Sequence, residues 1–185
     1  MKKLAVFIPG IGYTADKPLL YYSAKLTRAA GFDNFPLHFG GFPSNVRGSA
    51  DKMKESFLTA WEQTQRQMRD VDFGAYGRIL FVSKSIGTVI AARYQLENRI
   101  AADNIYFTPL EETFRFMRRG SGIAFHGSAD PWTEGVSIDD LCSQYNIPVC
   151  NVPGANHSLE TGDICRDILT LGRVMDIVQD RISSL

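Results

Sequence analysis

The stretch ILFVSKSIGTVIAARY, residues 79–94, decides the fold. It begins with a continuous apolar run that predicts a strand, turns at Ser85, and continues with residues that favour a helix. Ser83 and Gly87 flank Ser85 at a distance of two residues. A sharp strand–turn–helix bend needs such small residues, because the strand and the helix crowd one another there. The bend would raise the Ser85 hydroxyl above the sheet and aim the first N–H groups of the helix at the same point.

The turn departs from its usual form in one position. That form is G-x-S-x-G, and Ser83 stands in place of the first glycine. Serine is small enough to be tolerated there, although an ordinary strand–helix loop is an alternative interpretation. We expect Lys84, between the two serines, to be solvated or to lie at the rim of a pocket. A role for Lys84 in binding an anionic substrate is a further alternative.

A reactive serine needs a base, and the chain has only three histidines. His157 lies in the polar loop VPGANHSLE, residues 152–160, where a packing role is not expected. His38 and His126 lie at predicted strand ends, which is more typical of structural histidines. The sequence therefore favours His157 as the base.

The base in turn needs a carboxylate that orients it and stabilises its charged form. The tetrapeptide GSAD occurs twice and offers Asp51 and Asp130. Asp51 opens a predicted helix, whereas Asp130 follows a predicted strand in IAFHGSADPW, residues 123–132. Their positions favour Asp130.

Apolar runs and helical patterns alternate along the chain, which predicts a parallel sheet with helices on both faces. We expect one domain, residues 1–185, built as a three-layer α/β/α sandwich around a six-stranded, mainly parallel sheet. Ser85, Asp130 and His157 would follow the third, fifth and sixth strands, at the carboxyl edge where such sheets place their sites. The expected strands are residues 4–8, 35–39, 78–82, 104–107, 122–126 and 147–151; the expected helices are 17–30, 50–70, 86–98, 111–117, 137–145 and 162–182.

The first predicted strand ends in IPGIGYTADK, residues 8–17. Gly10, Gly12 and Ala15 fit the spacing G-x-G-x-x-A, which can bind the pyrophosphate of a dinucleotide. The same turn can also form one wall of an oxyanion site.

The flanking residues argue against a dinucleotide. A dinucleotide-binding helix would begin near Gly12 and would then contain Pro18, which costs about 3 kcal/mol or more inside a helix. Asp16 and Pro18 predict a later start, with Asp16 as the cap. The acid that would bind the ribose should end the second strand, but Asp33 precedes the strand that we expect. No cofactor is therefore predicted.

The motifs SKSIG, GSADPW and GANHS, together with the PGIG turn, resemble those of the α/β-hydrolase superfamily. The chain looks like a small member without a lid domain, similar to uncharacterised bacterial hydrolases. The resemblance covers nearly the whole chain. It implies the strand order 2-1-3-4-5-6, without the two antiparallel strands that open the fold in other members.

The resemblance also implies roles for single residues. Ser85 would be the nucleophile, His157 the general base and then acid, and Asp130 the residue that orients the histidine. The backbone N–H groups of Ile86 and Ile11 would bind the oxyanion. Gly12 or Tyr13 could take the place of Ile11.

The expected function is a serine hydrolase that cleaves a small ester, thioester or related acyl bond of a small-molecule substrate through an acyl-enzyme. The alternative is a non-catalytic ligand-binding protein that keeps the fold, since the first glycine of the turn and a lid are both missing. Residues that could line the pocket are Gly12, Tyr13, Phe42, Lys84, Met117 and Trp132, with Trp132 favoured because it lies near Asp130.

Composition narrows the partners. Twenty basic and twenty acidic residues balance, so no basic excess indicates nucleic acid. No apolar run approaches the roughly 20 residues that span a membrane. No two histidines are closely spaced, and therefore no metal site is predicted. The three cysteines form no C-x-x-C pair and are expected to be buried free thiols in the reducing cytoplasm, with a catalytic cysteine as the alternative.

Overall fold

A computed structural model describes the whole chain, residues 1–185, as one sheet of six strands. The strand order is β2-β1-β3-β4-β5-β6, and every neighbouring pair is parallel. The predicted α/β class and strand order are confirmed. The strands are β1 Lys3–Ile8, β2 Phe32–Pro36, β3 Arg78–Lys84, β4 Asp103–Phe107, β5 Gly122–Gly127 and β6 Val149–Val152.

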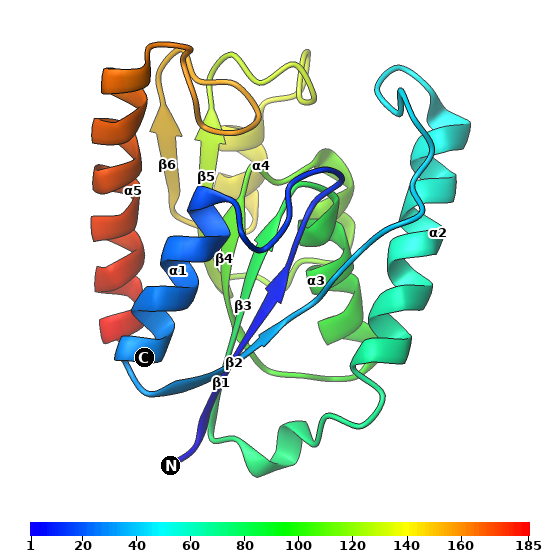
Figure 1. Cartoon of the computed structure of the whole chain (residues 1–185), viewed down its shortest axis with the longest axis vertical. Coiled ribbons are helices and arrows are strands. Elements are labelled where there is room, and N and C mark those ends of the chain that lie inside the picture. The colour runs from blue at the N-terminus through cyan, green and yellow to red at the C-terminus, as the bar shows by residue number, and fades with distance from the viewer.

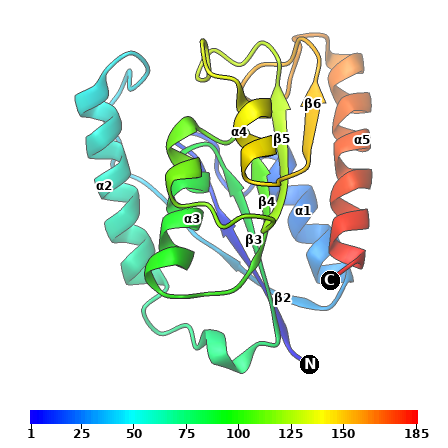
Figure 2. The same cartoon turned by 180° about the vertical axis from the view of Figure 1, so that it is seen from behind.

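Helices cover both faces of the sheet and complete the three layers (Figure 1). On one face lie α1 (Pro18–Ala29) and α5 (Ile164–Ser183). The other face carries α2 (Ala50–Gln67), α3 (Ile86–Glu97) and α4 (Ile138–Gln144), as the view from behind shows (Figure 2). Two short 3₁₀ turns, η1 (Phe73–Ala75) and η2 (Glu111–Arg115), lie in the connections. None of these helices combines the length and the apolar character needed to cross a bilayer.

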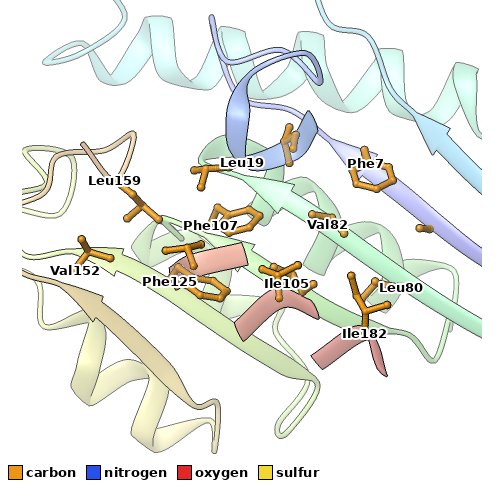
Figure 3. Packing of buried hydrophobic residues seen from close by; sticks show 14 of the residues in the cluster. Phe7, Leu19, Leu80, Val82, Ile105, Phe107, Phe125, Val152, Leu159 and Ile182 are labelled. Atoms are coloured by element: carbon orange, nitrogen blue, oxygen red, sulfur yellow. The ribbon is translucent and has the colours of Figure 1, made fainter. Parts of the chain in front are cut away.

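Alternating side chains of the central strands form two separate cores. In β3, Leu80 and Val82 point toward α1 and α5, whereas Phe81 packs against α2 and α3. Figure 3 shows the first core, where Phe107 and Phe125 also lie, with their ring centroids 5.1 Å apart. Burial of each such side chain stabilises the fold by about 1.5–3 kcal/mol. The central strands are therefore rigid supports for the loops at their carboxyl ends.

The second strand lies three residues earlier than we expected. It covers Phe32–Pro36 rather than 35–39, because Phe32 is buried and the segment pairs in parallel with β1, with Leu4 opposite Asp33. Asp33 is therefore inside the strand and not in front of it.

The first helix begins at Pro18, but the expected cap at Asp16 is wrong. Lys17 occupies the cap position and its side chain makes no capping hydrogen bond. The hydroxyl of Tyr13 accepts a hydrogen bond from the N–H of Leu19 at 3.1 Å. A residue of the preceding loop thus satisfies one of the free donors that begin every helix.

Candidate active site

Ser85 lies at the junction of β3 and α3 in a strained backbone conformation. Its φ is 57° and its ψ −127°, a region that residues with a side chain rarely adopt and that costs about 1–3 kcal/mol. Hydrogen bonds hold this conformation in place. The Ser85 N–H donates to the Phe107 carbonyl at 3.0 Å, and the Ser85 carbonyl accepts from the N–H of Thr88 at 2.8 Å. A strained conformation at a partly buried turn, held by hydrogen bonds on both sides, is typical of a functional position.

The serine that replaces the first glycine of the turn fits without distortion of the sheet. Ser83 is completely buried in β3, opposite Tyr106 in the neighbouring strand. Its hydroxyl donates a long hydrogen bond of 3.5 Å to the Ile105 carbonyl. The departure from G-x-S-x-G is therefore accommodated at the strand and does not alter the bend at Ser85.

The structure brings Ser85, His157 and Asp130 together, although they follow three different strands. His157 Nε2 lies 2.7 Å from Ser85 Oγ, and His157 Nδ1 lies 2.6 Å from Asp130 Oδ2. The other carboxylate oxygen of Asp130 accepts a hydrogen bond from the N–H of Trp132 at 2.9 Å. The Asp130 side chain has no exposed surface and that of His157 is 16% exposed. This continuous chain of hydrogen bonds can move a proton away from the serine hydroxyl.

Burial and the neighbouring charges set the protonation of the pair. Burial lowers the pKa of His157, and the hydrogen bond to Asp130 opposes this effect only in part. Burial alone would raise the pKa of Asp130, but the hydrogen bond and charge of His157 and the N–H of Trp132 lower it overall. At neutral pH the carboxyl group is therefore ionised and the imidazole is neutral, with one nitrogen able to accept a proton from Ser85.

The PGIG loop lies directly beside Ser85. A Cβ atom built on Gly10 would come within 3.1 Å of the Ser85 Cβ, a tight contact that glycine avoids at this approach of the loop to Ser85. The Gly10 N–H donates to the Tyr13 carbonyl at 3.1 Å and closes the loop, and Gly12 adopts a positive φ of 69°. The N–H of Ile11 makes no hydrogen bond within the chain. The N–H of Ile86 lies in the first turn of α3, where a helix leaves its donors free.

The residues expected to line a pocket fall into two groups. Trp132 and Tyr13 lie at the site: the Trp132 ring centroid is 5.5 Å from that of His157, and Tyr13 belongs to the loop just described. Phe42 packs against Phe39 and the core under α2. Met117 is buried in the cluster around Tyr106 and lines a hollow beside the start of β4, not the space around Ser85.

The position of Lys84 in the structure differs from the sequence-based prediction that it is solvated or lies at the rim of a pocket. Lys84 is 1% exposed and therefore neither solvated nor at a rim. A signal was present in the sequence, because Leu80, Val82 and Lys84 follow one another at the spacing of two that places side chains on the same face of a strand. The expected strand, 78–82, ended too early to include it.

Two hollows lie in the loops around the site, and Asp130 lines the second of them. One, of about 380 Å³, begins at Tyr13 and Ser158 and runs between α1 and α5 past Ile164 and Ile168. The other, of about 470 Å³, is formed by residues 128–131 and 133–136 and by His126, whose Nε2 is 2.9 Å from Thr133 Oγ1. No three His, Cys, Asp or Glu side chains gather in an arrangement that could hold a metal ion.

Comparison with solved structures places the chain in a known fold. No protein-family model and no curated protein sequence matches it. An α/β serine hydrolase homologue from Coxiella burnetii matches with a TM-score of 0.58 and 18% identity over 93% of this chain and 84% of that one. Est1E from Butyrivibrio proteoclasticus, in complex with ferulic acid, matches with a TM-score of 0.64 and 12% identity over 98% and 90%. The carboxylesterase from Bacillus cereus matches with a TM-score of 0.58 and 16% identity over 94% and 89%. The chain has the fold of the α/β-hydrolase superfamily.

Proposed function

We propose that this protein is a serine hydrolase that cleaves a small ester, thioester or related acyl bond through an acyl-enzyme intermediate. One observation carries the proposal: the hydrogen-bonded series Ser85–His157–Asp130, with Ser85 on a strained turn. The fold is shared with the carboxylesterase from Bacillus cereus and supports the same kind of reaction. Fold alone does not determine function, and the main support for the proposed activity is therefore the arrangement of side chains at the site.

In the proposed reaction, Ser85 Oγ attacks the acyl carbon while His157 Nε2 takes the serine proton. Asp130 keeps the imidazole in the tautomer that accepts at Nε2 and stabilises its positive charge. His157 then returns the proton to the leaving group, which departs and leaves the acyl group on Ser85. A water molecule, deprotonated by His157, attacks this ester and releases the acid, and the proton returns to Ser85.

The negative oxygen of each tetrahedral intermediate needs donors that are already in place. We assign the N–H of Ile86, at the positive end of α3, and the N–H of Ile11 in the PGIG loop, with the N–H of Gly12 as the alternative to Ile11. Loss of one such donor typically costs about 3–4 kcal/mol of transition-state stabilisation. Backbone donors do not depend on side-chain identity, which is why isoleucine can fill both positions.

A small acyl substrate fits the surroundings of Ser85. Trp132 lies beside His157 and offers an apolar surface next to the reacting group. It packs in one cluster with Ile86 and Val89 at the start of α3. The connections after the strands carry no inserted helical domain that could form a lid over the site, which favours a small or accessible acyl group.

A fluorophosphonate probe tests the proposal, because it reacts with an activated serine whatever the natural substrate is. The wild-type protein should be labelled at Ser85 and should hydrolyse a short p-nitrophenyl ester, and Ser85→Ala should do neither. A folded wild type without labelling and without hydrolysis would contradict the proposal. Ligand binding that survives both Ser85→Ala and His157→Ala, with no turnover in the wild type, would support the non-catalytic alternative.

A further inference from the structure

A buried lysine lies directly before Ser85 and is not used in the reaction just described. Lys84 is the last residue of β3 and is 1% exposed. By the alternation of side chains along a strand, its side chain leaves the sheet on the same face as Leu80 and Val82, which pack toward α1 and α5. Lysine is almost never buried so completely unless it has partners. Its partners therefore indicate what it does.

The first partner is a hydroxyl group that is itself held in a strained position. Lys84 Nζ donates to Thr108 Oγ1 at 2.7 Å. Thr108 is completely buried at the end of β4 and has a φ of 45°, which is exceptional for a β-branched residue. Its N–H donates to the Phe125 carbonyl at 2.7 Å, which fixes it against β5. This geometry holds the Thr108 hydroxyl at the Lys84 ammonium.

The second partner is the aromatic ring of Tyr13. Lys84 Nζ lies 5.0 Å from the centre of that ring, within the range of a cation–π interaction. Tyr13 closes the PGIG loop, because its carbonyl accepts from the Gly10 N–H and its hydroxyl accepts from the Leu19 N–H. The lysine therefore touches the loop that carries the N–H of Ile11.

We propose that Lys84 is a positioning residue: anchored by Thr108, it holds the Tyr13 ring and thereby keeps the oxyanion N–H of the PGIG loop aligned with Ser85. This proposal rests on the proposed hydrolase function and deepens it. The alignment matters because a displacement of about 1 Å can cost roughly 100-fold in rate.

The same ammonium group acts on the charges of the site. Burial lowers the pKa of Lys84 to about 7. The negative charges of Asp130, in the loop after β5, and Glu160, in the segment after β6, oppose this shift and favour the protonated form of the lysine. The positive charge of Lys84 in turn lowers the pKa of both Asp130 and His157. His126 also lowers the pKa of His157. Removal of the Lys84 charge should therefore raise the pKa of His157, an effect that a purely structural role would not produce.

Lys84→Met tests both effects, since methionine keeps much of the length and removes the charge. We expect kcat for a short p-nitrophenyl ester to fall by about 10- to 100-fold with little change in KM. The acidic limb of the kcat profile should also move to higher pH. Lys25→Met is the matched control: Lys25 also lies over a tyrosine ring, that of Tyr21 on the exposed side of α1, at 5.3 Å. That variant should keep both the rate and the profile of the wild type.

Thr108 provides a second pair of variants in case Lys84→Met fails to fold. Thr108→Val keeps the shape but removes the acceptor, and kcat should fall; Thr108→Ser keeps the hydroxyl and should retain most of the activity. The positioning role is overturned if folded Lys84→Met keeps wild-type kcat and an unshifted acidic limb, or if folded Thr108→Val keeps wild-type kcat, while the wild type is labelled at Ser85. If the wild type is not labelled by fluorophosphonate, the proposed hydrolase function itself fails, and the positioning role with it.

Discussion

Gly87 lies directly against the carbonyl oxygen of Ile8. A Cβ atom built on Gly87 would be only 2.4 Å from that oxygen, and equally close to the carbonyl oxygen of Pro9. The contact joins the start of α3 to the end of β1, the strand next to β3 in the sheet. It brings together the two backbone segments with free N–H groups, and the Ile11 side chain packs against the cluster that contains Ile86.

Gly87→Ala should therefore destabilise the protein, because the added methyl group meets backbone that cannot rotate away. We expect a loss of about 1–3 kcal/mol in the free energy of unfolding, measured by urea denaturation. Gly172→Ala is the matched control: Gly172 lies in α5 with nothing within 4 Å of its added Cβ. That variant should be stabilised by about 0.5–1 kcal/mol. Equal effects of the two substitutions would contradict the close approach at Gly87.

Asp130→Asn should leave the fold intact and lower kcat by roughly 10⁴-fold. The amide can donate to His157 Nδ1 and would then stabilise the tautomer that carries its proton on Nε2, which cannot accept the proton of Ser85. Ester hydrolysis measures the rate and thermal unfolding checks the fold. The matched control is Asp139→Asn, since Asp139 is an exposed partner of Asn151 outside the site. An Asp130→Asn variant with a near-normal rate would show that His157 is oriented by another group.

The pH dependence of kcat/KM should follow the protonation of His157. The reaction needs neutral imidazole, and burial holds the pKa of His157 below its ordinary value of 6.5. Activity should therefore persist as the pH falls through 6.5 and decline only at lower pH, where Nε2 becomes protonated. Hydrolysis rates and circular dichroism, recorded over the same range, separate this titration from acid unfolding. An acidic limb centred at or above pH 6.5 in a folded protein would contradict the direction of the shift.

Tyr13→Phe should affect stability more than catalysis. The ring remains over Lys84, but the N–H of Leu19 loses its acceptor at the start of α1. The expected cost is about 1 kcal/mol in the free energy of unfolding, with kcat changed only slightly. Tyr21→Phe is a suitable control because the Tyr21 side chain is on the exposed surface of α1. A loss of kcat comparable to that of Lys84→Met would mean that the Tyr13 hydroxyl, and not its ring, holds the loop.

The sequence predicted most of the strands and helices because the patterns that mark them are local. Continuous apolar runs mark the buried parallel strands, and small residues mark the bend at Ser85. The order of strands and helices follows from these patterns and from the rules that govern parallel connections. Ser85, Asp130 and His157 were placed after three separate strands, and in the structure they lie within hydrogen-bond distance of one another.

The details that were missed depend on contacts that form only in the folded chain and that no periodic pattern in the sequence encodes. The position of β2 follows from its register against β1, which no local pattern reveals. The cap of α1 comes from the hydroxyl of Tyr13 and not from the adjacent Asp16, because the folded loop brings Tyr13 to the Leu19 N–H.

Local patterns in the sequence determined the class of fold and the residues that follow the strands at the carboxyl edge of the sheet, since periodicity and small residues at bends are properties of the local chain. The strand order was predicted from the resemblance to the α/β-hydrolase superfamily. Only the tertiary structure decided which charges are buried. Lys84 carries a side chain that normally reaches water, and its burial depends on Thr108 and Tyr13, which lie in the segments that follow β4 and β1. Desolvation of a charge depends on everything that surrounds it, and that environment exists only after the sheet has formed.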